Sequence, residues 1–259
     1  MTAELIISDS LLSDVGLVIF DKDGTLIDVH TYWANMVRLR VESLNRQLDL
    51  TGQHFVGLME SMGADARNMR VKPTGPVGIE PREVVLQAGA DYLAASGYGD
   101  QTSALLQAFT EADTLSQTRL HDFIKPIAGL NAVLDSLRAC QCRIAVATTD
   151  RTDRAILTLR HLEISGLIDL VAGADSVHAA KPAPDIVRLI CDRLHVPVNH
   201  TVIVGDSVAD VRTGMNAGCL ASVGVTSGLT DARALRQVTP LVVPSIANIH
   251  VACPLSASD

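Results

Sequence analysis

The sequence predicts an α/β protein in which a parallel-sheet core is interrupted by an inserted all-helical cap domain. Two observations predict the core: short apolar, β-rich runs recur along the chain, and amphipathic helical segments separate them. A third predicts the insert, because the stretch after the first apolar run shows helical periodicity only. We therefore expect a Rossmann-like core formed by residues 1–28 and 123–259, and a cap formed by residues 29–122.

The first strand of the predicted sheet is the apolar run at 15–19, which leads directly into Phe20 and Asp21. The later β-rich runs lie at 144–147, 169–172, 201–204, 221–225 and 241–243. The helices between them are expected at 130–137, 156–162, 186–194 and 208–215. Continuous apolar strands joined by helices indicate a parallel sheet that is covered on both faces.

Four helices are expected in the insert. Apolar residues at three- and four-residue steps mark the first two, and a proline near the start and a glycine near the end mark the third. The four segments are 33–48, 55–62, 81–97 and a stretch that opens near residue 100.

Composition limits the class of protein. The 259 residues are 47% hydrophobic, which suffices for two buried cores, and the net charge of −8 argues against nucleic acid or an anionic membrane as the main partner. No apolar run approaches the roughly 18 residues of a membrane span, and Met1-Thr2-Ala3-Glu4 lacks the basic region of a secretory signal. We expect a cytoplasmic monomer or homodimer.

The cysteines and histidines give no sign of a metal site. The five cysteines are an odd number without a Cys-x-x-Cys pair, so we expect buried, reduced thiols. The eight histidines are scattered without ligand spacing, which gives little support to a zinc site or a histidine-based triad.

Two acids follow the first predicted strand. Asp21 and Asp23 come at its carboxyl end, where an open α/β sheet keeps its chemistry, and Gly24 lets the chain turn away at once. Carboxylates this close repel each other, so a divalent cation is their natural companion, and Mg²⁺ favours one or two carboxylates together with phosphate oxygens. The pair predicts a phosphate substrate, although Asp-x-Asp-Gly alone also fits a calcium loop or a solvated turn.

Three later segments carry polar groups that can meet this pair. Thr148 ends one strand and could bind a phosphoryl oxygen or cap a helix. Lys181 begins a Lys-Pro-Ala-Pro loop and could offset the acids or be merely solvated. Asp206 and Asp210 follow another strand at a spacing that joins them on one helical turn; both could address a metal, or serve as a helix N-cap and a surface acid.

Together these segments resemble the four motifs of the haloacid dehalogenase (HAD) superfamily. The matching stretches are Asp21-Lys22-Asp23-Gly24-Thr25, Thr148, Lys181-Pro182-Ala183-Pro184 and Gly205-Asp206-Ser207-Val208-Ala209-Asp210. They occur in the family's order, and the resemblance spans residues 15 to about 249. The chain departs from the family at Thr149-Asp150, since the family commonly has an asparagine after the motif-two hydroxyl.

The resemblance implies a Mg²⁺-dependent phosphatase, similar to phosphoglycolate phosphatases with a helical (C1-type) cap. It implies a nucleophile, Asp21, which forms an aspartyl-phosphate, and an acid and base, Asp23. It also implies two phosphate-binding residues, Thr148 and Lys181. The implied Mg²⁺ ligands are Asp21, the backbone carbonyl of Asp23, Asp206 and Asp210. The expected substrate is a small phosphorylated metabolite.

Two other functions remain open. A phosphomutase of the β-phosphoglucomutase type shares the fold, the cap and all four motifs, and passes the phosphoryl group to a sugar instead of water. A non-enzymatic signalling domain that is phosphorylated on aspartate uses similar chemistry, but with a different order of motifs and no cap.

Substrate selectivity is expected to lie in the cap. Arg67, Arg70 and Lys72 form a basic cluster in an acidic protein, next to the Pro/Gly-rich loop 73–78. The cluster could bind the far end of an anionic substrate, or it could be a solvated helix end.

Overall fold

The computed structural model describes residues 2–72 and 74–254, which form two compact units. Residues 1–28 and 126–259 form the first unit, the core, and residues 29–125 form the second, the cap. The core strands and helices run β1 Ala3–Ile7, β2 Ser10–Val15, β3 Leu17–Phe20, α6 Leu130–Ala139, β6 Arg143–Ala147, α7 Thr152–His161, β7 Leu170–Ala172, α8 Asp185–Leu194, β8 Thr201–Gly205, α9 Val208–Ala217, β9 Ala221–Val225, α10 Ala232–Arg236, β10 Val242–Val243 and β11 Ile249–Ala252.

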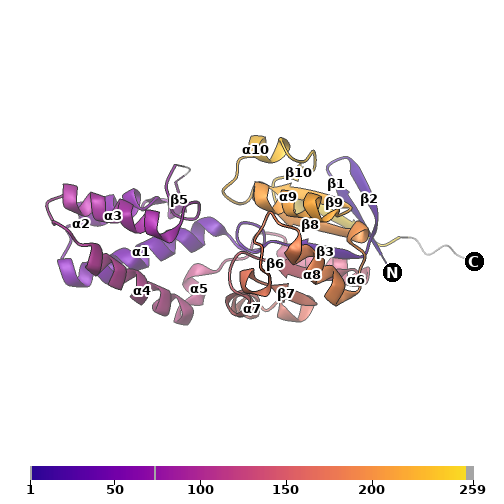
Figure 1. The fold of residues 1–259 in the computed structure, drawn as a ribbon, viewed down its shortest axis with the longest axis horizontal. Coiled ribbons are helices and arrows are strands. Elements are labelled where there is room, and N and C mark those ends of the chain that lie inside the picture. The colour runs from indigo at the N-terminus through magenta and orange to yellow at the C-terminus, as the bar shows by residue number, and fades with distance from the viewer. Residues whose placement is uncertain (1, 73, 255–259) are drawn as a thin grey trace, which may run out of the picture. The chain divides into compact units, whose positions relative to one another are not determined.

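The centre of the core is a six-stranded parallel sheet with the strand order β10-β9-β8-β3-β6-β7. Strand β3 comes from the start of the chain, yet it lies between β6 and β8, which come from the second half (Figure 1). All four of its residues are buried, and they point alternately to the two faces. The predicted doubly covered parallel sheet is therefore confirmed.

Each face of this sheet has its own apolar cluster. Val18 and Phe20 belong to the cluster that includes the buried side of α6, whereas Leu17 and Ile19 belong to the cluster that includes α8. The alternation explains why the strand reads as a continuous apolar run, because neither face is left to solvent.

The sequence reading missed a second sheet. Strands β1, β2 and β11 form a three-stranded antiparallel sheet in the order β11-β1-β2. Ala3, Leu5 and Ile7 alternate with less buried residues and join the cluster on the α6 side. The first and last described strands of the chain therefore help to cover the core.

The expectation of reduced cysteines is wrong for one pair. Cys140, at the end of α6, forms a disulfide with Cys253, just after β11. With β11 unrecognised, nothing in the sequence placed Cys253 against α6. The remaining cysteines, Cys142, Cys191 and Cys219, are free; the first two are buried and Cys219 is partly buried.

The cap unit contains helices as expected and a small ribbon that was not expected. Its elements are α1 Val29–Leu48, α2 Gly52–Ser61, β4 Ala64–Asp65, β5 Arg70–Val71, α3 Arg82–Ala95, α4 Thr102–Thr118 and α5 Leu120–Phe123. Helices α1 and α4 pack against each other, with the guanidinium of Arg40 lying 4.1 Å from the ring centre of Phe109. The expected border after residue 122 falls inside α5, which the compact unit keeps whole.

Among the residues that the structure describes, no helix combines the length and the apolar character needed to cross a bilayer.

Candidate active site

Three predicted site residues follow three adjacent strands of the parallel sheet. Asp21 follows β3, Thr148 follows β6 and Asp206 follows β8. Phe20 pairs in register with Val146 of β6 and Val204 of β8, so the three strands end at the same edge of the sheet. This edge, with β3 between two strands from later in the chain, is where open α/β sheets bind their ligands.

Lys181 joins two of the acids. Its Nζ atom donates hydrogen bonds to Asp21 Oδ1 at 2.8 Å and to Asp210 Oδ1 at 2.6 Å, and a third to the carbonyl oxygen of Ala147 at 2.8 Å. An ammonium group has three hydrogens, so these bonds use its whole donor capacity. The side chain is only 2% exposed, which rules out the solvated alternative for this lysine.

Both oxygens of the Asp210 carboxylate accept hydrogen bonds, and the first accepts from Lys181. Its second oxygen accepts hydrogen bonds from the backbone N–H and the hydroxyl of Ser207, which is the N-cap residue of α9. Asp210 is buried and is not a surface acid, and Ser207 rather than Asp206 caps the helix. The carboxylate of Asp210 therefore holds Lys181 and helix α9 together.

Asp206 lies in a close-fitting pocket of backbone. One of its oxygens accepts a hydrogen bond from the N–H of Leu229 at 3.2 Å. A Cβ atom on Gly24 would lie 2.7 Å from Asp206 Cγ, and one on Gly228 would overlap the carboxylate outright. Glycine is therefore required at both positions so that the two loops can approach this acid.

The electrostatics of the cluster favour a bound cation. Burial raises the pKa of Asp21 to about 7, although Lys181 opposes the shift. Burial, with the charges of Asp21 and Asp210, also raises the pKa of Asp206 well above its usual range. Burial disfavours the charged form of Lys181, but its two carboxylate partners outweigh it and raise its pKa.

The donor set fits a hard divalent cation. Oxygen atoms of Asp21, Asp206 and Asp210 lie within 4.8 Å of one another, and all three residues are buried. Carboxylate oxygens are the ligands that Mg²⁺, Ca²⁺ and Mn²⁺ prefer, and a cation relieves the repulsion that raises these pKa values. The buried acids could therefore hold a metal.

Thr148 is almost fully buried, and its hydroxyl oxygen accepts a hydrogen bond from the N–H of Asp150 at 3.1 Å. That bond uses an oxygen lone pair and not the hydroxyl hydrogen, which keeps Thr148 suited to donate to a phosphoryl oxygen.

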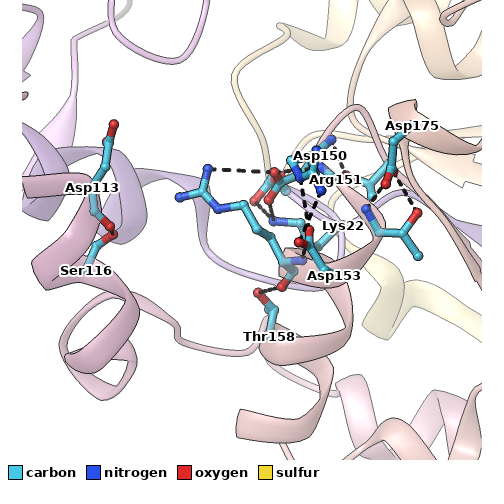
Figure 2. A network of polar contacts seen from close by, with 12 residues as sticks. Lys22, Asp113, Ser116, Asp150, Arg151, Asp153, Thr158 and Asp175 are labelled. Carbon is cyan, nitrogen blue, oxygen red and sulfur yellow. Dashed lines mark hydrogen bonds and ion pairs between the residues drawn. The ribbon is translucent and has the colours of Figure 1, made fainter. Parts of the chain in front are cut away.

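Asp23 has a partner that the sequence reading did not identify. Lys22, only 2% exposed, places Nζ 2.8 Å from Asp23 Oδ1 and 3.4 Å from Asp150 Oδ2. Figure 2 shows Lys22 beside Asp150 in a network of acids and arginines. The only signal in the sequence was a lysine between two acids, and an acid at 150 where the family pattern differs. The contacts of Gly228 and Leu229 with Asp206 had no signal at all.

The three basic residues of the proposed specificity cluster lie in the cap unit. Arg67 and Arg70 are exposed; Arg70 is in β5, and Lys72 follows it with Nζ 4.0 Å from Glu60. The turn between β4 and β5 is held by Asp65, which accepts the N–H groups of Arg67 and Asn68. Pro73, the first residue of the loop at 73–78, lies outside the described residues.

Comparison with known proteins shows which family and which relatives this chain is similar to. Residues 15–218 match the family model of haloacid dehalogenase-like hydrolases. The phosphoglycolate phosphatase of Caulobacter vibrioides is 26% identical over 236 residues, which cover 91% of this chain and 90% of that protein. The phosphorylated carbohydrates phosphatase of Thermotoga maritima is 28% identical over 143 residues, covering 51% of this chain and 66% of that protein.

A solved structure shows the same fold. The protein from Thermotoga maritima that is provisionally described as a beta-phosphoglucomutase aligns with a TM-score of 0.66 and 22% sequence identity, covering 90% of this chain and 95% of that one.

Proposed function

Because this chain belongs to the haloacid dehalogenase-like hydrolases, we propose that it is a phosphatase that hydrolyses a small phosphorylated metabolite through an aspartyl-phosphate on Asp21. The observation that carries the proposal is the buried Asp21 carboxylate at the end of β3, where Lys181 holds one oxygen and leaves the other to attack. The names of the matching phosphatases support the same reaction class.

In the first half of the reaction, an Asp21 oxygen bonds to phosphorus and the bond from phosphorus to the leaving oxygen breaks. Asp23 gives its proton to that leaving oxygen. In the second half, water attacks phosphorus, Asp23 takes the water's proton, and the bond from Asp21 to phosphorus breaks. Two displacements of this kind replace one harder step.

Thr148 and Lys181 stabilise the equatorial phosphoryl oxygens, with Thr148 donating a hydroxyl hydrogen and Lys181 contributing its charge. A Mg²⁺ ion held by Asp21, the backbone carbonyl of Asp23, Asp206 and Asp210 would neutralise charge on the nucleophile and the phosphate. Asp210 serves in addition as the anchor that keeps Lys181 beside the nucleophile.

Selectivity is assigned to Arg67, Arg70 and Lys72 of the cap. Their positive charge is concentrated around one short ribbon in a protein of net charge −8, which suits an anionic group at the far end of the substrate.

The test is a screen of small phosphorylated metabolites for release of inorganic phosphate, run with Mg²⁺ and with a chelator. We expect metal-dependent release that Asp21→Asn abolishes. Isomerisation of a sugar phosphate without phosphate release would assign the chain to the phosphomutases, which form the same aspartyl-phosphate. Phosphate release that survives both the chelator and Asp21→Asn would refute the proposal.

A further inference from the structure

Lys22 is buried, although lysine is rarely buried in proteins unless its charge is paired. Its side chain is 2% exposed, and a buried ammonium is costly unless it is paired. The acids Asp23 and Asp150, which pair with it, are themselves partly exposed, Asp23 at 28% and Asp150 at 22%. The charged end of Lys22 therefore lies beneath two carboxylates that reach toward solvent.

The backbone on either side of this contact is fixed. The carbonyl oxygen of Lys22 accepts the N–H groups of both Leu26 and Ile27, at 2.9 and 3.1 Å, which closes a tight turn after β3. Lys22 thus extends from a rigid base between the nucleophile and the proton donor.

Asp150 is fixed as firmly. Its N–H donates to the hydroxyl of Thr148, and its carbonyl oxygen accepts the N–H of Ala174 at 2.9 Å. Its side-chain Oδ1 accepts the N–H of Arg151 at 2.8 Å, which leaves Oδ2 to face Lys22 at 3.4 Å. Figure 2 shows this carboxylate and Lys22 together at the start of α7.

The side chain of Asp23 is held by fewer contacts than Asp150 and is more exposed than Lys22. Its carboxylate pairs with Lys22, at 2.8 Å, and more than a quarter of its side chain is exposed. A carboxylate anchored at one oxygen is restricted in its rotation, and it presents its second oxygen in a defined direction. Without the anchor, rotation about the side-chain bonds is restricted by local packing alone.

We propose that Lys22 is the positioning residue for the acid and base Asp23, and that Asp150 is the fixed support of Lys22. This assignment rests on the proposed function and deepens it. Lys22 acts through Asp23 and not on the phosphoryl group. Asp150 gives the buried ammonium an acidic partner whichever way Asp23 turns during the reaction. A displacement of about 1 Å at a catalytic group can cost about a hundredfold in rate, so holding one oxygen of Asp23 matters.

The test compares two leaving groups. An alkyl phosphate found by the screen needs a proton on its leaving oxygen, whereas p-nitrophenyl phosphate hardly does. We expect Lys22→Met to lower kcat on the alkyl phosphate about 10- to 100-fold more than on the aryl phosphate, since general acid catalysis contributes about 10²- to 10⁴-fold. Asp150→Asn is expected to shift the ratio of the two kcat values in the same direction, by less.

The ratio of the two kcat values is the informative quantity, because a smaller folded fraction lowers both rates equally and leaves their ratio unchanged. Asp153→Asn is the matched control for Asp150→Asn: it removes the same charge from an acid three residues away that is 65% exposed and paired to Arg151. It should leave the ratio unchanged. In the double variant Lys22→Met/Asp150→Asn, the ratio should equal that of Lys22→Met, because Asp150 acts through Lys22.

Should Lys22→Met fail to fold, Asp150→Asn, at a partly exposed position, carries the test alone. A ratio that stays at the wild-type value in every variant that folds would overturn the assignment of Lys22, provided that the unaltered protein hydrolyses both substrates with Mg²⁺. If the unaltered protein hydrolyses neither, the proposed function fails and this assignment fails with it.

Discussion

The ammonium of Lys181 lies 2.8 Å from Asp21 Oδ1, although 160 residues separate the two in the chain. The same ammonium lies 2.6 Å from Asp210 Oδ1, so one buried cation connects Asp21, the proposed nucleophile, to the start of α9. Removal of the Lys181 charge leaves two carboxylates without a cation in a dry site, whereas removal of one acid leaves a neutral pair, and this difference underlies the first two predictions.

Asp21→Asn should abolish turnover and leave the fold intact. The substitution removes the proposed nucleophile without changing side-chain volume, and the amide oxygen can still accept from Lys181. We expect kcat to fall at least about a thousandfold, and the melting temperature to change by less than about 5 °C. Steady-state kinetics and a thermal melt check both values. Retention of more than about a thousandth of the wild-type kcat would argue against a covalent route.

Lys181→Met should cost both activity and stability. It leaves Asp21 and Asp210 without their shared cation, so we expect the free energy of unfolding to fall by about 3 kcal/mol or more at neutral pH. Urea denaturation measures this. The double variant Lys181→Met/Asp210→Asn should recover part of the lost stability but none of the activity. A double variant no more stable than the single one would show that the charge imbalance is not the cause.

Stability without metal should fall as pH rises from about 4 to about 7. The pKa of Asp21 is raised from 3.8 to about 7 in the folded chain, so the folded state binds more protons than the unfolded state within this window. Its contribution to stability is therefore complete below the window and is lost as pH rises through it. Asp206, whose pKa is also raised, adds in the same direction.

Mg²⁺ should reverse this loss, because it binds the ionised carboxylates. At a concentration about 100 times its Kd, a ligand adds about 2.7 kcal/mol, or roughly 5–10 °C in melting temperature for a chain of this size. We expect a shift of that order at about pH 8 and a much smaller one at about pH 5, where protons compete. Asp206→Asn should reduce the shift. An equal shift at both pH values would contradict binding to these acids.

Arg70→Ala should lower kcat/KM for the natural substrate but not for a generic aryl phosphate. If Arg70 binds a distal anionic group, kcat/KM for the natural substrate should fall about 10- to 100-fold, while p-nitrophenyl phosphate, which lacks such a group, is spared. Arg119→Ala is a matched control, because it removes an exposed arginine of the same unit that pairs with Asp122. Unchanged kcat/KM for every substrate would leave Arg70 as a surface charge.

The strands that lead to the candidate site could be predicted from the sequence because they are buried on both faces. β3, β6 and β8 are almost entirely buried, so each appears as an unbroken apolar run that ends at a polar residue of the site. Parallel strands then place those polar residues at one edge, and this is why Asp21, Thr148 and Asp206 could be grouped without coordinates.

The features that the sequence did not predict depend on contacts between distant segments of the chain. β2 is largely exposed and contains two serines and an aspartate, so its composition resembles a loop, and β11 is short. The ion pair of Lys22 with Asp150 depends on the directions in which the two side chains leave the turns after β3 and β6, which the sequence does not reveal. The backbone contacts of Gly228 around Asp206 depend in the same way on the folded loop.

The pairing of β1 with β11 has a consequence for the order in which the chain is made. β1 leaves the ribosome before its partner β11, and nearly all the rest of the described chain is made between the two. During that interval β1 can pair with β2 alone, so one of its edges offers unpaired N–H and C=O groups to any other strand. A nascent chain stalled before residue 249 should therefore be prone to aggregation and dependent on chaperones, whereas one extended through Cys253 can pair this edge and close the disulfide with Cys140.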